Sequence, residues 1–417
     1  MSSRAKTTAT KGDGNPSLTP KLRFPEFRDA EEWELRQLGE YLNESRLPGT
    51  KGNVAKKITV KLWGNGVFGK TEAVHGSVNT QYFRRKAGQF IYSKLDFINQ
   101  AFGIIPGNLD NFESTVDLPC FDIAEGLNSV FLLEYVRRKD YYEKVGEAAD
   151  GSRKARRIHA ETFLSFPVTL PSSVEQQKIA DCLSSVDELI AAQARKLDAL
   201  KIHKKGLMQQ LFPRDGETQP RLRLPEFLNS PEWMVKPFGE AATFYNGRAY
   251  KQEELLEDGK YKVLRVGNFF TNNSWYYSDL KLDDTKYCEE GDLLYAWSAS
   301  FGPRMWRGKK AVYHYHIWKV IERQGIDRRF LFIALENETS KIKSQSANGL
   351  GLLHITKGTI ESWESAFPRP AEQRRIADCL TSLDDLIAAQ AQGLEALKTH
   401  KKGLMQQLFP SQVEAAA

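Results

Sequence analysis

Few residues of this chain are spaced for catalysis. Residues 64–71, GNGVFGKT, fit the phosphate-binding pattern GxxxxGK[ST], in which backbone amides and a lysine hold nucleotide phosphates. That loop must lead directly into a helix, because the amides of the helix N-terminus complete the site. The next residues, TEAVHGSVNTQYF, are poor helix formers, and no apolar strand ends in paired acidic residues that could hold magnesium. A nucleotide-binding protein stays an alternative, to be tested by Lys70→Ala.

The histidines and cysteines do not follow a metal-site or disulfide pattern. His314 and His316 alternate in YHYHIWK and would face one side of a strand, but no third ligand lies near them. We therefore expect strand-face or DNA-contact roles for both. The chain lacks the GxSxG and HExxH motifs, so we expect no catalytic residues, no metal site and no bound cofactor. No CxxC pair occurs among the four cysteines, which are Cys120, Cys182, Cys288 and Cys379.

Basic and aromatic residues are mixed in the loops of two β-rich stretches. This mixture suits nucleic acid, because Lys and Arg neutralise phosphates while Arg, Asn and Gln carry the paired groups that read base edges. The net charge of +6 permits such a partner without proving it, and a solvated loop has the same composition. The candidate DNA contacts are Arg84, Arg85, Lys86, Lys94 and Arg156 in the first stretch and Arg248, Arg265, Asn268, Arg304, Arg307 and His316 in the second.

The segments that would position these residues form an internal sequence repeat. Residues 175–213 recur as residues 372–410, and 30 of the 39 aligned positions are identical. A weaker repeat, the Leu-Arg-x-Pro-Glu-Phe motif, occurs in KLRFPEF from Lys21 and in RLRLPEF from Arg221. The stretches between these repeats, roughly residues 41–170 and 241–367, share almost no sequence. Repeated connectors with different bodies predict two unlike readers on one symmetric support, because a solenoid would repeat its whole unit.

Each long repeat has the pattern of a coiled-coil helix. Apolar residues alternate at steps of three and four, no proline interrupts the run, and about 37 residues at 1.5 Å each give rods of roughly 55 Å. Two independent surface helices are the alternative. The predicted seam consists of Ile179, Leu183, Val186, Ile190, Gln193, Leu197 and Leu200 in the first copy and Ile376, Leu380, Leu383, Ile387, Gln390, Leu394 and Leu397 in the second.

The charges within this seam predict how the two helices pair. A parallel pair would place Lys204 against Lys401, and like charges in contact are unfavourable. An antiparallel pair would instead bring Lys204 near Asp378 and Lys401 near Asp181. We therefore expect two long antiparallel helices.

Length and composition predict several folded domains of the α+β class. The 417 residues exceed the usual size of one domain, 41% are hydrophobic, and runs such as GDLLYAW and AVYHYHIWKV read as strands while RFLFIALENE reads as a short helix. No long apolar segment or secretory start is present, so we expect a cytoplasmic protein. The expected order is a disordered tail at 1–20, a first body at 21–170, a helical spacer at 171–213, a linker at 214–220, a second body at 221–368, a helical spacer at 369–410 and a tail at 411–417.

This organisation resembles the specificity subunits of type I restriction-modification systems. The resemblance rests on EQQKIADCL with KLDALKIHKKGLMQQLF, on EQRRIADCL with LEALKTHKKGLMQQLF, and on LRFPEF and LRLPEF. It implies that the bodies are target-recognition domains which read a split, asymmetric target on double-stranded DNA, and that the helices set the distance between its halves. It further implies two modification (methyltransferase) subunits and restriction (translocase and nuclease) subunits as partners, which would bind S-adenosylmethionine, ATP and Mg. A two-lobed scaffold for protein partners without DNA readout is the other alternative.

Overall fold

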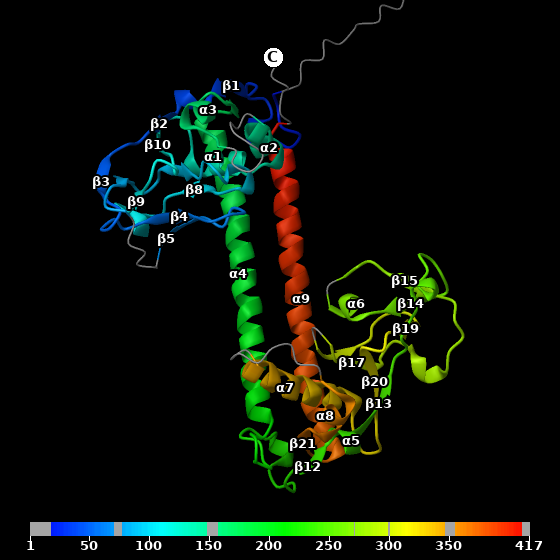
Figure 1. Cartoon of the computed structure of the whole chain (residues 1–417). Helices are drawn as coiled ribbons and strands as arrows, with labels where there is room; N and C mark the ends of the chain where they lie inside the picture. The colour runs from blue at the N-terminus through cyan, green and yellow to red at the C-terminus, as the bar shows by residue number, and fades with distance from the viewer. Residues whose placement is uncertain are drawn as a thin grey trace, which may run out of the picture. The chain divides into compact units, whose positions relative to one another are not determined.

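The chain folds into two compact units of mixed helices and sheets. The computed structural model describes residues 18–70, 77–147, 157–270, 272–298, 301–346 and 355–410 (Figure 1). Unit 1 comprises Met1–Ala194 with Gln392–Ala417, and unit 2 comprises Arg195–Ala391. The α+β class is confirmed. The expected tails lie outside the described residues, apart from positions 18–20, and so does Arg156.

In unit 1 the body is built from short strands and three short helices. The strands form sheets in the orders β1-β11, β2-β10-β7-β8, β3-β6-β9 and β4-β5. The elements are β1 (Glu34–Gln37), β2 (Leu42–Glu44), β3 (Pro48–Lys51), β4 (Ile58–Val60), β5 (Val67–Gly69), β6 (Gln81–Arg84), β7 (Phe90–Tyr92), β8 (Phe102–Ile104), β9 (Glu113–Ser114), β10 (Cys120–Ile123), α1 (Ser129–Val136), α2 (Lys139–Glu147), α3 (Ala160–Leu164), β11 (Pro167–Leu170) and α4 (Ser173–Leu211).

In unit 2 the sheets have the orders β12-β21, β13-β20-β17-β18 and β15-β14-β19-β16. The elements are β12 (Met234–Pro237), α5 (Phe238–Ala241), β13 (Ala242–Asn246), β14 (Tyr261–Leu264), α6 (Val266–Phe270), β15 (Tyr276–Ser278), β16 (Tyr287–Cys288), β17 (Leu293–Ala296), β18 (Gly302–Met305), β19 (Ala311–Tyr313), β20 (Ile317–Glu322), α7 (Arg328–Ser346), α8 (Lys357–Ser362), β21 (Glu364–Phe367) and α9 (Pro370–Leu408). The helix expected from RFLFIALENE is thus α7, which is longer than that run.

The repeated Leu-Arg-x-Pro-Glu-Phe motif fastens the start of a long helix in each unit. In unit 1 the Arg23 guanidinium donates to both oxygens of Glu175, at 2.9 and 2.7 Å. In unit 2 Arg223 donates to Glu372 in the same way, at 2.8 Å twice. Both carboxylates are 1% exposed and lie near a helix N-terminus, where the helix dipole favours negative charge. The motif is therefore a buried two-pronged ion pair.

Within each unit the long helices run antiparallel. In unit 1 the Lys401 ammonium of α9 lies 2.7 Å from Asp187 of α4, and in unit 2 Lys204 of α4 lies 2.7 Å from Asp384 of α9. The predicted orientation is confirmed, and every predicted seam residue is buried or half-buried.

The predicted ion-pair partners were wrong by six residues in both cases. Asp378 instead pairs with Arg329 at 2.8 Å, and Asp181 accepts from Gln177. The physical reason lies at Gly393, where a Cβ atom would come within 3.1 Å of the Gln193 amide. The missing side chain lets Gln193 lie beside residue 393 in unit 1, so the register is shifted from the one expected.

One alternative loses support and two local predictions need correction. The described part of the GxxxxGK[ST] match, residues 64–70, is not a phosphate loop, because Val67–Gly69 is a strand that pairs antiparallel with Ile58–Val60 in a hairpin. The run YKVLRVGNF is half strand and half helix, since α6 begins at Val266. The run AVYHYHIWKV is two strands, so His314 and His316 lie in a turn rather than alternating along one strand.

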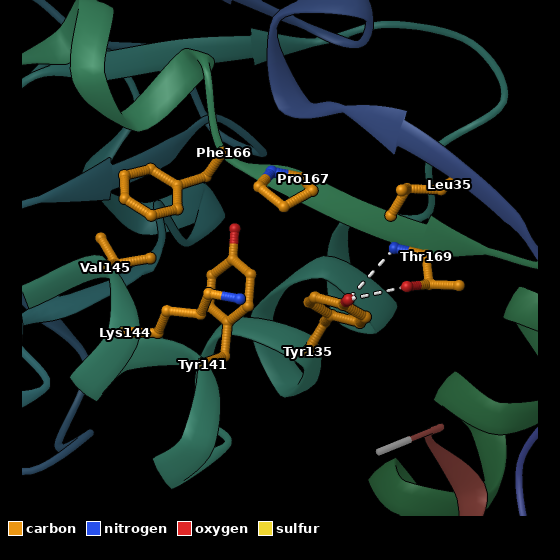
Figure 2. A pocket seen from close by; sticks show the side chains of 8 residues that line it. All are labelled: Leu35, Tyr135, Tyr141, Lys144, Val145, Phe166, Pro167 and Thr169. Carbon is orange, nitrogen blue, oxygen red and sulfur yellow. Dashed lines mark hydrogen bonds between the residues drawn. The ribbon is translucent and has the colours of Figure 1, made fainter. Parts of the chain in front are cut away.

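An aromatic core holds the body of unit 1 against α4, and a small cavity remains in it beneath β11. Tyr135 accepts a hydrogen bond from the Thr169 amide at 3.0 Å (Figure 2). The neighbouring Tyr141 hydroxyl is buried, and burial raises its pKa well above the ordinary value. The cavity holds about 20 Å³, which is room for one water molecule and too little for a nucleotide.

Candidate nucleic-acid interface

The basic surface of unit 1 comes from one nearly acid-free stretch of chain. Residues 45–95 contain ten Lys and Arg residues against a single carboxylate, Glu72. The described part of this stretch builds β3, β6, the β4–β5 hairpin and β7. Such a concentration of positive charge is the electrostatic footprint of a polyanion site.

The buried carboxylate of Glu113 on β9 joins the hairpin to the β3–β6–β9 sheet. It accepts from the backbone and hydroxyl of Thr50 on β3, at 2.8 and 2.9 Å. The Glu113 amide donates to the Lys56 carbonyl at 2.7 Å, and Glu113 is the register partner of Arg84. The hairpin and the sheet are therefore held together. Their exposed cations are Lys51, Lys56, Lys61, Lys70, Arg84 and Lys86.

Arg85 was wrongly predicted to contact DNA. Its side chain is 2% exposed and donates to Ser114 Oγ at 2.8 Å and to the Ser45 carbonyl at 2.6 Å. The reason is strand geometry: neighbouring residues point to opposite faces, so Arg84 faces solvent while Arg85 fills the interior. Lys94 is half-buried on another loop, after β7, where its carbonyl accepts from Ile158.

A basic groove continues from the hairpin tip along unit 1. The Arg137 guanidinium lies 3.4 Å from the Gly64 carbonyl at that tip. Arg138 is 7% exposed, its Nε and Nη2 have no hydrogen-bond partner among the described residues, and Nη2 lies 3.7 Å from Asp140. The groove is lined by Lys21, Gln100, Arg137, Arg138, Lys139, Asp140, Tyr142, Glu143, Lys402, Met405, Gln406, Phe409 and Pro410.

In unit 2 the predicted residues Arg248, Arg265 and His316 come together where several strands end. The Arg248 backbone forms a parallel bridge with His314, whose amide donates to the carbonyl of Leu264, the residue before Arg265. This close approach requires Gly247, since a Cβ atom there would lie 2.3 Å from the His314 carbonyl oxygen.

Aromatic rings and cations alternate on this surface. Trp297 packs edge-on against His316, with centroids 4.8 Å apart. The Arg304 guanidinium lies 5.1 Å from the Phe270 ring of α6, and Arg265 lies 5.3 Å from the Tyr276 ring. These contacts hold the flat guanidinium groups, and arginine is the residue type best suited to bidentate hydrogen bonds with guanine or phosphate. Arg307, the remaining predicted cation, is exposed after β18.

Asn268, a predicted DNA contact, makes hydrogen bonds within its own loop. Its amide nitrogen donates to the carbonyls of Asn272, at 3.1 Å, and Ser274, at 2.6 Å. Its oxygen accepts from the Arg265 amide at 3.4 Å. Both donors are used within the loop, so the side chain shapes the loop that carries Arg265.

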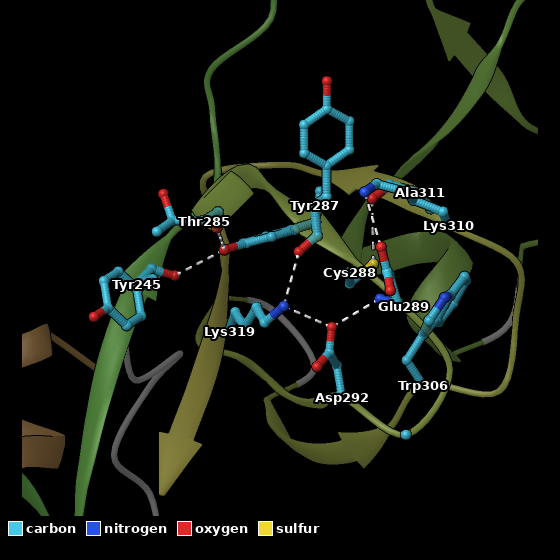
Figure 3. A network of polar contacts seen from close by, with 12 residues as sticks. Tyr245, Thr285, Tyr287, Cys288, Glu289, Asp292, Trp306, Lys310, Ala311 and Lys319 are labelled. Carbon is cyan, nitrogen blue, oxygen red and sulfur yellow. Dashed lines mark hydrogen bonds and ion pairs between the residues drawn. The ribbon is translucent and has the colours of Figure 1, made fainter. Parts of the chain in front are cut away.

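A polar network beneath the surface fixes the β19–β20 turn. Lys319 donates to Asp292 at 2.7 Å and to the Tyr287 carbonyl at 3.1 Å (Figure 3). The Tyr313 hydroxyl donates to the Thr285 carbonyl, and Lys310 pairs with Glu289 at 2.8 Å. Lys319 and Lys310 are thus neutralised, whereas Arg265, Arg304, Arg307 and Lys309 are exposed cations of this surface.

The histidines of the turn are not arranged as a metal site. In the part of the chain that the structure describes, no group of three or more His, Cys, Asp or Glu residues could hold an ion. Burial, together with His316 and Arg265, lowers the pKa of His314 to about 4. His314 is therefore neutral near pH 7 and able to accept or donate a hydrogen bond.

Sequence reasoning missed two exposed aromatics beside these cations, which are Trp63 and Tyr315. A count of Asp and Glu along the chain would have identified the cation-rich stretches in which these aromatics lie. Residues 45–95 contain only Glu72, and two acid-free runs of unit 2 are residues 259–278, with three cations, and residues 293–321, with five. Parallel pairing of Val263 with Val312 brings these last two runs together.

Comparison with known proteins finds chains that are similar to this one. Residues 231–399 match the family model of the type I restriction modification DNA specificity domain. The MjaVIII specificity subunit of a type I restriction enzyme from Methanocaldococcus jannaschii is 23% identical over 93% of this chain and 94% of its own length. The putative MjaX specificity subunit from the same organism is 24% identical over 68% of this chain and 67% of its own length.

Solved structures agree at the level of the fold. The S subunit of a type I system from M. genitalium superposes with a TM-score of 0.59 at 16% identity, covering 95% of this chain and all of that one. A chain from a structure of type I complex assembly gives 0.57, also at 16% identity, covering 91% of this chain and 98% of that one. No described helix is long and apolar enough to cross a membrane. Taken with the duplicated helices and the two unlike bodies, these matches make the chain similar, over nearly its whole length, to the specificity subunits of type I restriction-modification systems.

Proposed function

We propose that this chain is the DNA-recognition subunit of a type I restriction-modification complex and has no catalytic activity of its own. Each unit reads one half of a bipartite, asymmetric target. The observation that carries the proposal is the contrast between near-identical helices and two different basic, aromatic surfaces. Unlike surfaces select unlike half-sites, since base contacts specify the sequence whereas phosphate contacts only position the protein.

The two helices also share exposed residues that no packing within the chain explains. Lys201, His203, Lys205, Gln209 and Gln210 of α4 are exposed, and the same residue types are exposed at the equivalent positions of α9. A surface present twice fits one partner bound twice. We infer that this partner is the modification subunit, in two copies, and that restriction subunits join the same complex. S-adenosylmethionine, ATP and Mg would then be bound by those partner chains.

The experiment is to express the chain with its partner subunits and to map adenine methylation across genomic DNA. We expect a split motif of two unlike halves separated by an unread gap. Arg84→Ala should relax one half only and Arg265→Ala the other half only, so each variant is the matched control of the other. A continuous or palindromic motif would contradict the two-reader mechanism.

The same experiment decides the alternative of a protein scaffold. A scaffold would assemble the complex without any DNA preference, so methylation would follow no motif that depends on Arg84 or Arg265. The nucleotide-binding alternative has lost its structural basis, because Val67–Gly69 forms a strand of a hairpin rather than a phosphate loop.

A further inference from the structure

Trp63 lies at the tip of the β4–β5 hairpin with its side chain largely in solvent. It is 65% exposed, and the neighbouring Leu62 and Phe68 are 39% and 43% exposed. A single exposed apolar residue needs no explanation. Three on one short hairpin, with a tryptophan at the tip, form an apolar projection that the fold itself does not bury.

The backbone of Trp63 is strained and is held in place by its surroundings. Its φ angle is +60°, in the left-handed region that residues other than glycine rarely adopt, although glycines follow at positions 64 and 66. The Trp63 amide donates to the Asn99 carbonyl at 2.7 Å, and the Gly64 amide donates to the Gln100 carbonyl at 3.0 Å. Strain of this kind persists only where the fold imposes it, and it marks functional positions.

The charges around the tip show which partner it fits. No carboxylate occurs between residues 45 and 71, whereas six cations do. The Lys61 ammonium lies 4.3 Å from the Phe68 ring, and Lys70 is exposed at the end of β5. An apolar projection on a stretch of chain that carries cations and no carboxylate is complementary to stacked bases between phosphates.

The geometry points to Trp63 as a wedge that inserts its indole ring at a base step of the target duplex, while Lys61 and Lys70 hold the flanking phosphates. This inference rests on the proposed function and adds a contact made by stacking rather than by hydrogen bonds. Side chains that enter a base step unstack it and bend the duplex. Unit 1 would therefore also select for steps that unstack easily.

The test uses the complex of the full chain with its partner subunits. The probe is a fluorescein-labelled duplex that carries the motif found by methylation mapping. Trp63→Ala should weaken binding roughly 5- to 150-fold, the loss expected when a ring stacked on a base is removed. The slope of log affinity against log salt should stay unchanged, because tryptophan displaces no counterion. Lys70→Ala should lower that slope by about 0.9.

Two further measurements separate a wedge from a structural residue. Trp63→Gly relieves the strained φ angle, so we expect an unchanged or higher melting temperature together with the same loss of affinity. Duplexes with 2-aminopurine placed in turn along the half-site should brighten at one step with the wild type and not with Trp63→Ala. Val54→Ala, in a 68% exposed side chain of the same cation-rich stretch, is the matched control and should change neither measurement.

Three results would overturn the wedge. The first is equal affinity of Trp63→Ala and Val54→Ala, the second is a lower melting temperature for Trp63→Gly, and the third is loss of complex assembly on sizing, which would make Trp63 a protein contact. In each case an unaltered split methylation motif would leave the proposed function standing. Failure of the wild-type complex to prefer any motif would remove both.

Discussion

The buried ion pair between Arg223 and Glu372 predicts a large and local effect of one substitution. Arg223→Met removes two hydrogen bonds to Glu372 and two more to the carbonyls of Ser230, at 2.7 Å, and Pro231, at 2.8 Å. The carboxylate is 1% exposed and would keep one described donor, the Trp233 indole at 3.2 Å. Removing one partner of such a pair costs about 3 to 5 kcal/mol, because the remaining charge stays buried and unpaired.

Hydrogen exchange is the suitable assay, because a chain of two units need not unfold in one step. At 1.4 kcal/mol per factor of ten, the loss corresponds to roughly 150- to 4000-fold faster exchange, up to the limit set by global unfolding. We expect it in β12 and in the first turn of α9. The equivalent amides beside Arg23 in unit 1 should not change, and Arg23→Met should reverse the pattern.

The exposed pair between Arg375 and Glu226 provides the matched control. Its side chains are 58% and 42% exposed, so Arg375→Met should leave hydrogen exchange in unit 2 nearly unchanged. If Arg223→Met cost no more than Arg375→Met, the motif would not act as a buried clamp. If exchange rose equally in both units, the effect would not be local, and the reasoning would also fail.

Three further predictions concern the interior, the pH dependence and the helices. Arg85→Met should destabilise unit 1 by about 3 kcal/mol, since it strands buried acceptors, whereas Arg84→Ala should leave the denaturation midpoint unchanged and weaken DNA binding. The folded pKa of His314, about 4, lies below the ordinary histidine value of about 6.5, so its contribution to stability is complete above 6.5 and is lost as the pH falls toward 4. Half burial suggests about 1 to 2 kcal/mol, measurable as a smaller acid shift of the melting temperature in His314→Gln. Deleting 14 residues from both α4 and α9 shortens each by about 21 Å and should shorten the unread gap of the methylation motif or abolish binding. An unchanged gap would contradict the expectation that the helices set the distance between the two halves of the target.

The long helices were predictable because their pattern repeats over many turns. A seven-residue period fixes the buried face whatever the partner is, so the seam from Ile179 onward followed from sequence. The register did not follow, because it depends on single contacts such as that of Gln193 beside Gly393. A hydrophobic pattern does not show where a glycine lets the partner helix approach closely. The predicted partner of Lys204 was therefore wrong by six residues.

The candidate DNA surfaces were predictable as regions and not as residues. Composition identified Arg84 and Arg85 together, but which of two neighbours faces solvent depends on the phase of a four-residue strand. Sequence likewise could not show that the Asn268 amide donates its hydrogen bonds within its own loop, because a loop's hydrogen bonds depend on its conformation. The gathering of Arg248 and Arg265 around one turn required the pairing of strands distant in sequence.

The contacts between each body and its helices indicate how the bodies could diverge while the helices stayed nearly identical. In unit 1 Lys401 lies 3.0 Å from Glu134 on α1, and in unit 2 Lys204 lies 3.4 Å from Glu336 on α7. Both lysine side chains are less than 15% exposed, so each needs a carboxylate beyond the one on the partner helix. The two bodies share almost no sequence, yet each supplies it. The helix pair therefore requires of each body one carboxylate that reaches its largely buried lysine. The rest of the body, including a surface that reads DNA, can differ as long as this carboxylate is present.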